Sequence, residues 1–223
     1  MNKVLFVAVH PDDETLGCGG TILKHKAQGD EIYWMIITSI RNHPLNFSHE
    51  IVEKRDKTIK AVAAAYGFDG VLELDIPTTL VDKSDLGVLV TKVGKYIDEI
   101  KPDVVYMMHE YDVHSDHRVS FSALYSCLKS FRHPFVKQIY SFEALSETEF
   151  AVATAANTFI PNVYVDITDF LDRKLDIMSL YDTEVMQEPY PRSLSSIKAL
   201  ARVRGSRCGA MYAEAFMLLY ARK

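Results

Sequence analysis

A continuous apolar run near the N-terminus places the strongest constraint on how this chain folds. Lys3 to Val9 reads KVLFVAV, is rich in β-branched residues and has no alternating polar positions. Strands of parallel sheets are covered by helices on both faces and show this pattern, whereas a strand with one wet face alternates apolar and polar residues. The run therefore predicts a buried strand of a parallel sheet, with a helix after it.

Later segments repeat this pattern along the 223 residues. The segment GGTILKHKAQGD, from Gly19 to Asp30, has helical spacing of its apolar residues, and the apolar run EIYWMIITSI follows it. Further predicted helices and strands alternate: HEIVEKRDKTIKAVAAAYGF, VLELDI, DLGVLVTKVGKYIDEIKP, DVVYMMH, HRVSFSALYSCLKSF, KQIYSFEAL, NVYVDIT and DFLDRKLDIMSLY. This alternation predicts a Rossmann-like three-layer α/β/α sandwich with a mostly parallel sheet.

Composition narrows the class of protein. A hydrophobic fraction of 48% suits one well-cored domain over residues 1–223, and EPYPRS is interpreted as a loop inside that domain. The net charge of −5 at pH 7 argues against binding to nucleic acid or to an anionic membrane. Cys18, Cys127 and Cys208 are widely spaced and odd in number, so we expect a reduced, cytoplasmic protein without disulfides. No run reaches membrane-spanning length, and a homo-oligomer is left open.

Two clusters of polar residues follow predicted strands. The first strand leads into HPDD, from His10 to Asp13, and DVVYMMH leads into EYDVHSDHR. The second cluster contributes Asp112, His114, Asp116 and His117. Ligands of open α/β sheets bind beyond the carboxyl ends of the strands, so both clusters belong to one edge. Each loop alone is typical of a solvated surface, but the pair favours a metal site with a water, a base and an acid.

The glycines behind the first cluster have two interpretations. Gly17, Gly19 and Gly20 do not form the dinucleotide-binding pattern, and a glycine-rich turn lets the first helix pack closely. Alternatively, the turn and the helix N-terminus form an anion cradle in a nucleotide- or sugar-binding module without catalysis. That alternative gives no reason for His114 and His117.

At these residues the chain resembles the PIG-L/LmbE-like zinc-dependent de-N-acetylases, which remove acetyl groups from N-acetylglucosaminyl compounds. The family signatures [AP]HPDDE and HPDH stand here as VHPDDE and HSDH. The resemblance extends to EKRDKTIKAVAAAYGF, PNVYVDIT and RVRGSRCGAMYAEAF, and so to nearly the whole chain. It implies one Zn²⁺ per chain, with Fe²⁺ or another divalent ion as an alternative, and a small N-acetylated sugar conjugate as substrate.

The resemblance also implies a role for each residue of the two motifs. His10, Asp13 and His117 would hold the metal, and Asp12 would be the general base toward the metal-bound water that attacks the amide. His114 would be protonated, as the acid or oxyanion stabiliser, with Asp116 keeping it charged and oriented. Free and metal-bound carboxylates differ in basicity, so adjacent aspartates can do different work. The same groups would suit another amide or acyl bond, and this alternative stays open.

Fewer sequence features indicate which residues contact the substrate. Arg55 matches the arginine of the family's second helix that helps to hold the sugar, although Thr58 stands where a glutamate is usual and Ser115 where a proline is usual. We expect Glu14 to brace the turn or cap the helix. Further candidates near the mouth of the site are Arg41, Tyr111, Tyr212 and Glu214, each with a structural role as an equal alternative.

Overall fold

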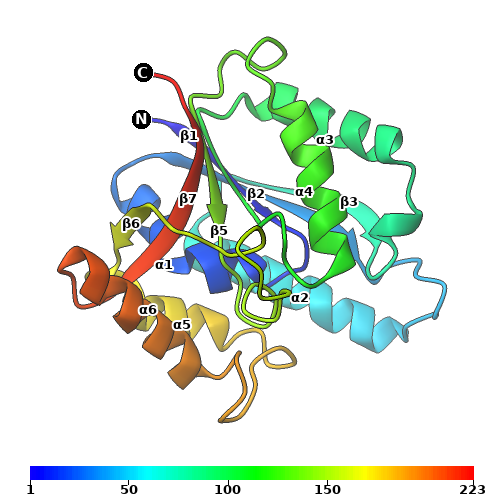
Figure 1. The fold of residues 1–223 in the computed structure, drawn as a ribbon. Helices are drawn as coiled ribbons and strands as arrows, with labels where there is room; N and C mark the ends of the chain where they lie inside the picture. Colours follow the sequence, from blue (N-terminus) through cyan, green and yellow to red (C-terminus); the bar gives the residue numbers. More distant parts are fainter.

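The computed structural model describes residues 1–223 and consists of one seven-stranded sheet with helices on both faces (Figure 1). The strands are β1 (Lys3–Ala8), β2 (Glu31–Ser39), β3 (Gly70–Pro77), β4 (Val104–Met107), β5 (Gln138–Phe142), β6 (Val163–Asp166) and β7 (Ala213–Ala221). The helices are α1 (Asp13–Ala27), α2 (His49–Tyr66), α3 (Leu86–Ile100), α4 (Ser115–Cys127), α5 (Leu171–Met178) and α6 (Leu194–Cys208), with 3-10 turns η1 (Val81–Lys83) and η2 (Thr168–Phe170).

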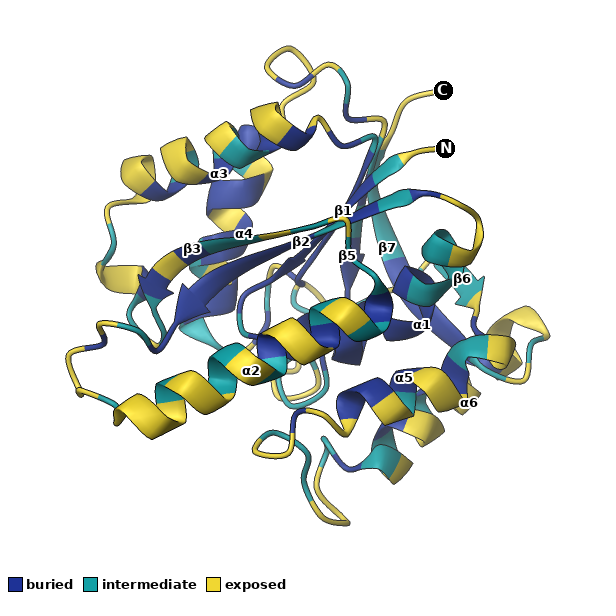
Figure 2. Cartoon of the chain, turned by 180° about the vertical axis from the view of Figure 1, so that it is seen from behind, coloured by how far each residue is buried: buried dark blue, intermediate teal, exposed yellow.

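The sheet order is β3-β2-β1-β4-β5-β7-β6, and the first five strands pair in parallel. Strand β7 runs antiparallel to its neighbours β5 and β6. Helices α3 and α4 cover one face, and α1, α2, α5 and α6 cover the other (Figures 1 and 2). The predicted three-layer α/β/α sandwich with a mostly parallel sheet is therefore confirmed.

The core lies on both faces of β1. Val4 to Val9 are all completely buried, as the unbroken apolar run predicts for a strand with helices above and below it. Helix α1 lies deep in the molecule and buries every residue from Asp13 to Ile22. Figure 2 shows the contrast with α2, whose outer face is exposed. Polar residues at the start of α1 are thus held in an enclosed, rigid setting.

The start of α1 differs from the prediction. The helix begins at Asp13 rather than near Gly19, so Gly17, Gly19 and Gly20 lie inside it and not in a turn before it. A Cβ on Gly20 would lie 2.6 Å from Cβ of Ile167, and one on Gly19 would lie 2.8 Å from the Tyr66 hydroxyl. The glycines therefore allow close packing of the helix, and acidic side chains in its first turn suit the positive end of its dipole.

The last helix and strand were not predicted from the sequence pattern. Helix α6 turns only Ile197, Ala201 and Gly205 toward the interior, and two of these are too small to produce a clear apolar stripe. Strand β7 completes the sheet between β5 and β6. Measured by length and hydropathy together, no helix of the structure is suited to span a bilayer.

Candidate active site

The site lies where two neighbouring strands end. Strand β1 leads through His10 into α1, and β4 leads through a loop into α4, with His117 in its first turn. Successive strands move away from β1 in one direction as far as β3, and β4 then returns to its other side. This reversal of strand order separates the two loops and leaves a crevice, the usual ligand position in open α/β sheets.

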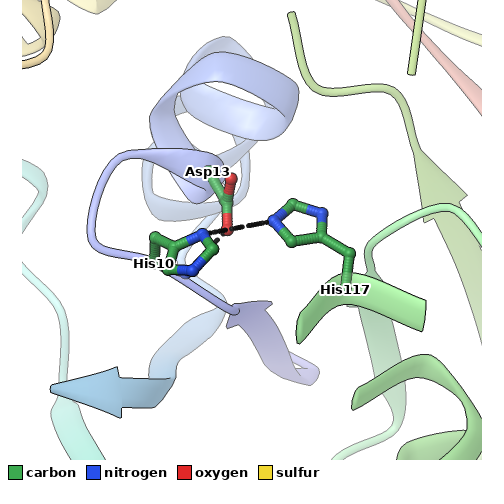
Figure 3. A group of neighbouring side chains, drawn as sticks. All are labelled: His10, Asp13 and His117. Atoms are coloured by element: carbon green, nitrogen blue, oxygen red, sulfur yellow. Dashed lines mark hydrogen bonds and ion pairs between the residues drawn. The ribbon is translucent and has the colours of Figure 1, made fainter. Parts of the chain in front are cut away.

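His10, Asp13 and His117 converge in this crevice (Figure 3). Nε2 of His117 lies 3.3 Å from Oδ2 of Asp13 and 3.4 Å from Nδ1 of His10, and those last two atoms are 3.9 Å apart. Ligands bound at zinc distances in a tetrahedron lie about 3.4 Å from one another. The spacing and the two-histidine, one-carboxylate donor set therefore fit a divalent cation of the zinc type.

In both histidines, the ring nitrogen that faces away from the other two proposed ligands is in contact with a carboxylate. Nδ1 of His117 lies 2.8 Å from Oδ2 of Asp112, and Nε2 of His10 lies 3.2 Å from Oδ2 of Asp116. With the proton assigned to the carboxylate side, each inner nitrogen keeps a lone pair for a metal. Such outer carboxylates also fix the orientation of each ring.

The electrostatics favour positive charge between these groups. Burial opposes charge on Asp13 and on His117, yet the pKa of Asp13 is lowered and that of His117 is raised, because the two side chains are in contact. Asp13 Oδ2 also accepts hydrogen bonds from the backbone amides of Val9 and His10, at 2.9 and 2.8 Å. A cation placed at this point would be stabilised by the same negative charge.

Asp12 belongs to the cleft but not to the ligand group. Its backbone has φ 145° and ψ −27°, a conformation that side chains rarely adopt, and its carboxylate does not cap α1. Burial, followed by the neighbouring Asp13 and Glu184 charges, raises its pKa, and Arg192 opposes this shift. Nη1 of Arg192 lies 3.5 Å from Oδ2 of Asp12. The strained backbone thus holds, beside Arg192, a carboxylate that is not part of the proposed ligand group.

Glu14 braces this turn from inside the protein. It accepts hydrogen bonds from the hydroxyls of Thr15 and Tyr181, at 2.5 and 2.7 Å, and from the amide of Asp12 at 3.2 Å. Its side chain is completely enclosed, and this burial raises its pKa to about 7. The carboxyl group therefore supports the position of Asp12 without reaching the cleft, as expected of a brace.

The contacts of His114 and Asp116 differ from the expected pair. Oδ2 of Asp116 is 4.0 Å from Nδ1 of His114, and its carboxylate is instead held by His10 and by the amides of Thr79 and Val81. Nδ1 of His114 accepts from the Asp116 amide at 3.1 Å, and burial, followed by His10, lowers the pKa of His114. Asp116 therefore orients His10, and because Nδ1 of His114 accepts from an amide, the donor of this ring is Nε2.

A cleft of about 520 Å³ opens from this site, within the range of pockets for small organic ligands. His10, Asp12, Asp13 and His114 line its floor. Its walls include charged residues from two distant segments, namely Lys54 and Arg55 of α2 and Asp182, Glu184 and Arg192 of the segment between α5 and α6. Arg55, which the family resemblance implies as a sugar contact, thus lines the cleft, with Nη2 2.9 Å from Oε1 of Glu184.

Arg41 does not line this cleft. Its guanidinium contacts three carboxylates, with distances of 2.6 Å to Asp56, 2.7 Å to Glu73 and 3.0 Å to Asp75. These contacts tie the loop after β2 to α2 and β3. The structural role therefore accounts for Arg41 better than substrate binding does, because an arginine with three acidic partners has little capacity left for a ligand.

Tyr111, Tyr212 and Glu214 also lie outside the cleft. Tyr111 packs against the ring of His109, and Tyr212 packs beside Lys198 of α6. Glu214 is buried beneath α1, where it pairs with Lys174 at 2.7 Å. The structure thus brings the two polar motifs and Arg55 together but leaves Arg41 and these three residues elsewhere.

Comparison with known proteins identifies the family. The family model of PIG-L, described as GlcNAc-PI de-N-acetylase, matches residues 5–128, more than half of the chain. The chain belongs to the PIG-L family. The matched segment contains both polar motifs, so the family assignment and the convergence of His10, Asp13 and His117 concern the same part of the molecule.

Two curated PIG-L-type relatives are deacetylases by name. Diacetylchitobiose deacetylase of Thermococcus kodakarensis is 23% identical over 235 residues, which cover 96% of this chain and 82% of that protein. Probable N-acetyl-alpha-D-glucosaminyl L-malate deacetylase 2 of Bacillus anthracis is 22% identical over 192 residues, covering 81% of this chain and 80% of that protein. The conserved protein TT1542 of Thermus thermophilus has the same fold, with a TM-score of 0.79, 24% identity and coverage of 100% and 97% of the two chains.

Two kinds of site residue in this PIG-L chain were not predicted from the sequence. Asp112 stands five residues before His117 and was noted in the polar cluster, but its support of the ligand histidine was not assigned. Glu184 and Arg192 lie in a proline-containing loop beyond the matched segment. Charges in such a loop are typical of solvated surface, so no local signal distinguishes them.

Proposed function

We propose that this chain is a zinc-dependent hydrolase that removes the N-acetyl group from an N-acetylglucosamine-type conjugate. The proposal rests on one observation: groups suited to bind a metal and a carboxylate suited to act as a base lie at the floor of the same cleft. His10, Asp13 and His117 fit a metal, while the carboxylate of Asp12 lines the same cleft outside this group. The family match and the names of the two relatives support this activity.

His10, Asp13 and His117 would hold the metal. When bound there, the cation would supply Lewis-acid chemistry by polarising the acetamide carbonyl and making water more acidic. Asp112 and Asp116 would keep the inner nitrogens of His117 and His10 available, as their contacts on the far sides of the rings indicate. Zinc is favoured over magnesium or calcium because two of the three donors are imidazoles.

Asp12 would act as the general base. Its carboxylate lines the cleft and would accept a proton from the water that attacks the acetamide carbonyl carbon. His114 lines the same floor and, with Nδ1 engaged by the Asp116 amide, would donate a hydrogen bond from Nε2 to the developing oxyanion. Asp12, protonated by the attacking water, would pass that proton to the departing amine. The carbon–nitrogen bond breaks, and acetate and the free amino sugar leave.

The cleft walls would hold the sugar. Arg55 and Glu184 form a polar pair at the wall, and such planar side chains can hydrogen-bond to sugar hydroxyls. Residues 1–223 would act as one catalytic domain, since a single large core cluster includes residues from Val4 to Phe216. The cytoplasmic location remains a prediction from cysteine usage.

The binding-module alternative loses its main support in this fold. Gly17, Gly19 and Gly20 lie inside α1 against neighbouring side chains rather than in a loop that surrounds a ligand. Hydrolysis of another amide or acyl bond stays the second candidate, because the cleft-floor groups suit any carbonyl of that kind.

The proposal is tested by acetate release from a panel of N-acetylated sugars, sugar nucleotides and glycosides, with ester and peptide substrates beside them. Zinc-loaded protein should release acetate from N-acetylglucosamine conjugates, and treatment with a chelator should abolish this release until zinc is added back. Turnover of esters or peptides without turnover of any acetamido sugar would contradict the proposal. Activity that survives complete metal removal would exclude the metal-dependent mechanism.

A further inference from the structure

The cationic side chains of the cleft wall already have acidic partners. Nζ of Lys54 lies 2.7 Å from Oδ2 of Asp182, and Nη2 of Arg55 lies 2.9 Å from Oε1 of Glu184. Nη1 of Arg192 lies 3.5 Å from both Oε2 of Glu184 and Oδ2 of Asp12. No lysine or arginine that lines the cleft is therefore left without a carboxylate nearby.

Glu184 is the centre of this arrangement. Its two carboxylate oxygens face two different guanidinium groups, one from Arg55 and one from Arg192. Their side chains are only 20 to 25% exposed, so solvent screens them less than it screens the more exposed pair of Lys54 and Asp182. A carboxylate or phosphate that approached either arginine would also approach Glu184, and like charges in a partly buried site repel.

Glu147 adds another carboxylate to the lining of the cleft, and its Oε2 is buried without a hydrogen-bond partner. The acidic side chains of the lining therefore outnumber its lysines and arginines; they are Asp12, Asp13, Glu147, Asp182 and Glu184. A carboxylate or phosphate that entered the cleft would meet this excess of carboxylates, whereas a neutral group would not.

We infer that the group attached to N-acetylglucosamine in the substrate is neutral, as a second sugar is, rather than a carboxylate or phosphate. This inference rests on the proposed deacetylase function and specifies its substrate class. One curated relative is named for a neutral diacetylated disaccharide and the other for a malate conjugate. The sequence identities of the two relatives to this chain are nearly equal. The charge balance of the cleft, not sequence identity, separates the alternatives.

The test compares two substrates that share the same reacting sugar, N,N'-diacetylchitobiose and N-acetylglucosaminyl malate. With zinc-loaded protein at low ionic strength, kcat/KM for acetate release should be at least about tenfold higher for the neutral disaccharide. Equal values, or a preference for the malate conjugate, would overturn the inference and leave the proposed function intact. Release from neither these substrates nor any other acetamido sugar would overturn both.

A charge-swap experiment tests the cause of the preference. Glu184→Gln leaves both arginines without their shared carboxylate, so the ratio of kcat/KM for the malate conjugate over the disaccharide should rise about tenfold. Glu188→Gln makes the same chemical change at an exposed position of the same segment, outside the cleft, and should leave the ratio unchanged. If Glu184→Gln lowers both values by the same factor, the charge argument is wrong, because a purely structural loss does not discriminate between substrates.

Discussion

Oδ2 of Asp112 lies 2.8 Å from Nδ1 of His117, the ring nitrogen opposite the one that faces His10 and Asp13. Both side chains are completely buried. The carboxylate therefore fixes the ring of a proposed metal ligand and favours the tautomer whose inner nitrogen carries a lone pair.

Replacing this carboxylate should weaken metal binding. Asp112→Asn keeps the shape of the side chain but removes its charge, and the Kd for Zn²⁺ should rise about 10- to 100-fold. Competition with a chromogenic chelator measures this Kd. Asp172→Asn, an exposed change on α5, is the matched control and should leave it unaltered. An unchanged Kd in Asp112→Asn would mean that His117 needs no orienting partner.

The glycines of α1 should respond to substitution as packing residues. Gly20→Ala places a Cβ 2.6 Å from Ile167 and should lower the free energy of unfolding by about 1–3 kcal/mol. Gly94→Ala, in α3, meets only Cys127 Sγ at 4.0 Å and should instead be neutral or stabilising by up to about 1 kcal/mol, because alanine favours helices. Urea denaturation of the two variants measures the difference. Equal stabilities would argue against close packing of α1.

The buried pair of Lys174 and Glu214 should contribute to stability rather than to turnover. Lys174→Met leaves the Glu214 carboxylate without its cationic partner in an enclosed site and should destabilise the fold by about 3–5 kcal/mol. The double variant Lys174→Met, Glu214→Gln removes the unpaired charge and should recover part of this loss. Chemical denaturation measures both variants, and a loss below about 1 kcal/mol in the single variant would contradict the buried pairing.

The features of this molecule that could be predicted are those that a short stretch of sequence determines. KVLFVAV indicates a doubly covered strand because every position is apolar after the first lysine, and the structure buries Val4 to Val9 completely. The two polar motifs meet because strand-end loops of a parallel sheet share an edge, which the alternation of strands and helices already implies. Fold class and the neighbourhood of His10 and His117 were therefore within reach of the sequence.

The rest depends on contacts between distant segments. The family resemblance implies a partnership between Asp116 and His114, but the carboxylate of Asp116 reaches His10 instead. Arg192 approaches Asp12 from a loop 180 residues further along the chain. Helix α6 contributes small residues to the interior and leaves little trace in the apolar pattern. None of these relationships has a periodic or spacing signal.

Asp12 is the proposed base for metal-dependent deacetylation by this protein. The most direct test of this role is quantification of acetate and free amine from N,N'-diacetylchitobiose, using zinc-loaded wild-type protein and Asp12→Asn at equal metal content. We predict equimolar acetate and amine from the wild type, and turnover lowered by about 10²- to 10⁴-fold in Asp12→Asn with zinc still bound. Near-normal turnover in the zinc-loaded Asp12→Asn protein would contradict the account.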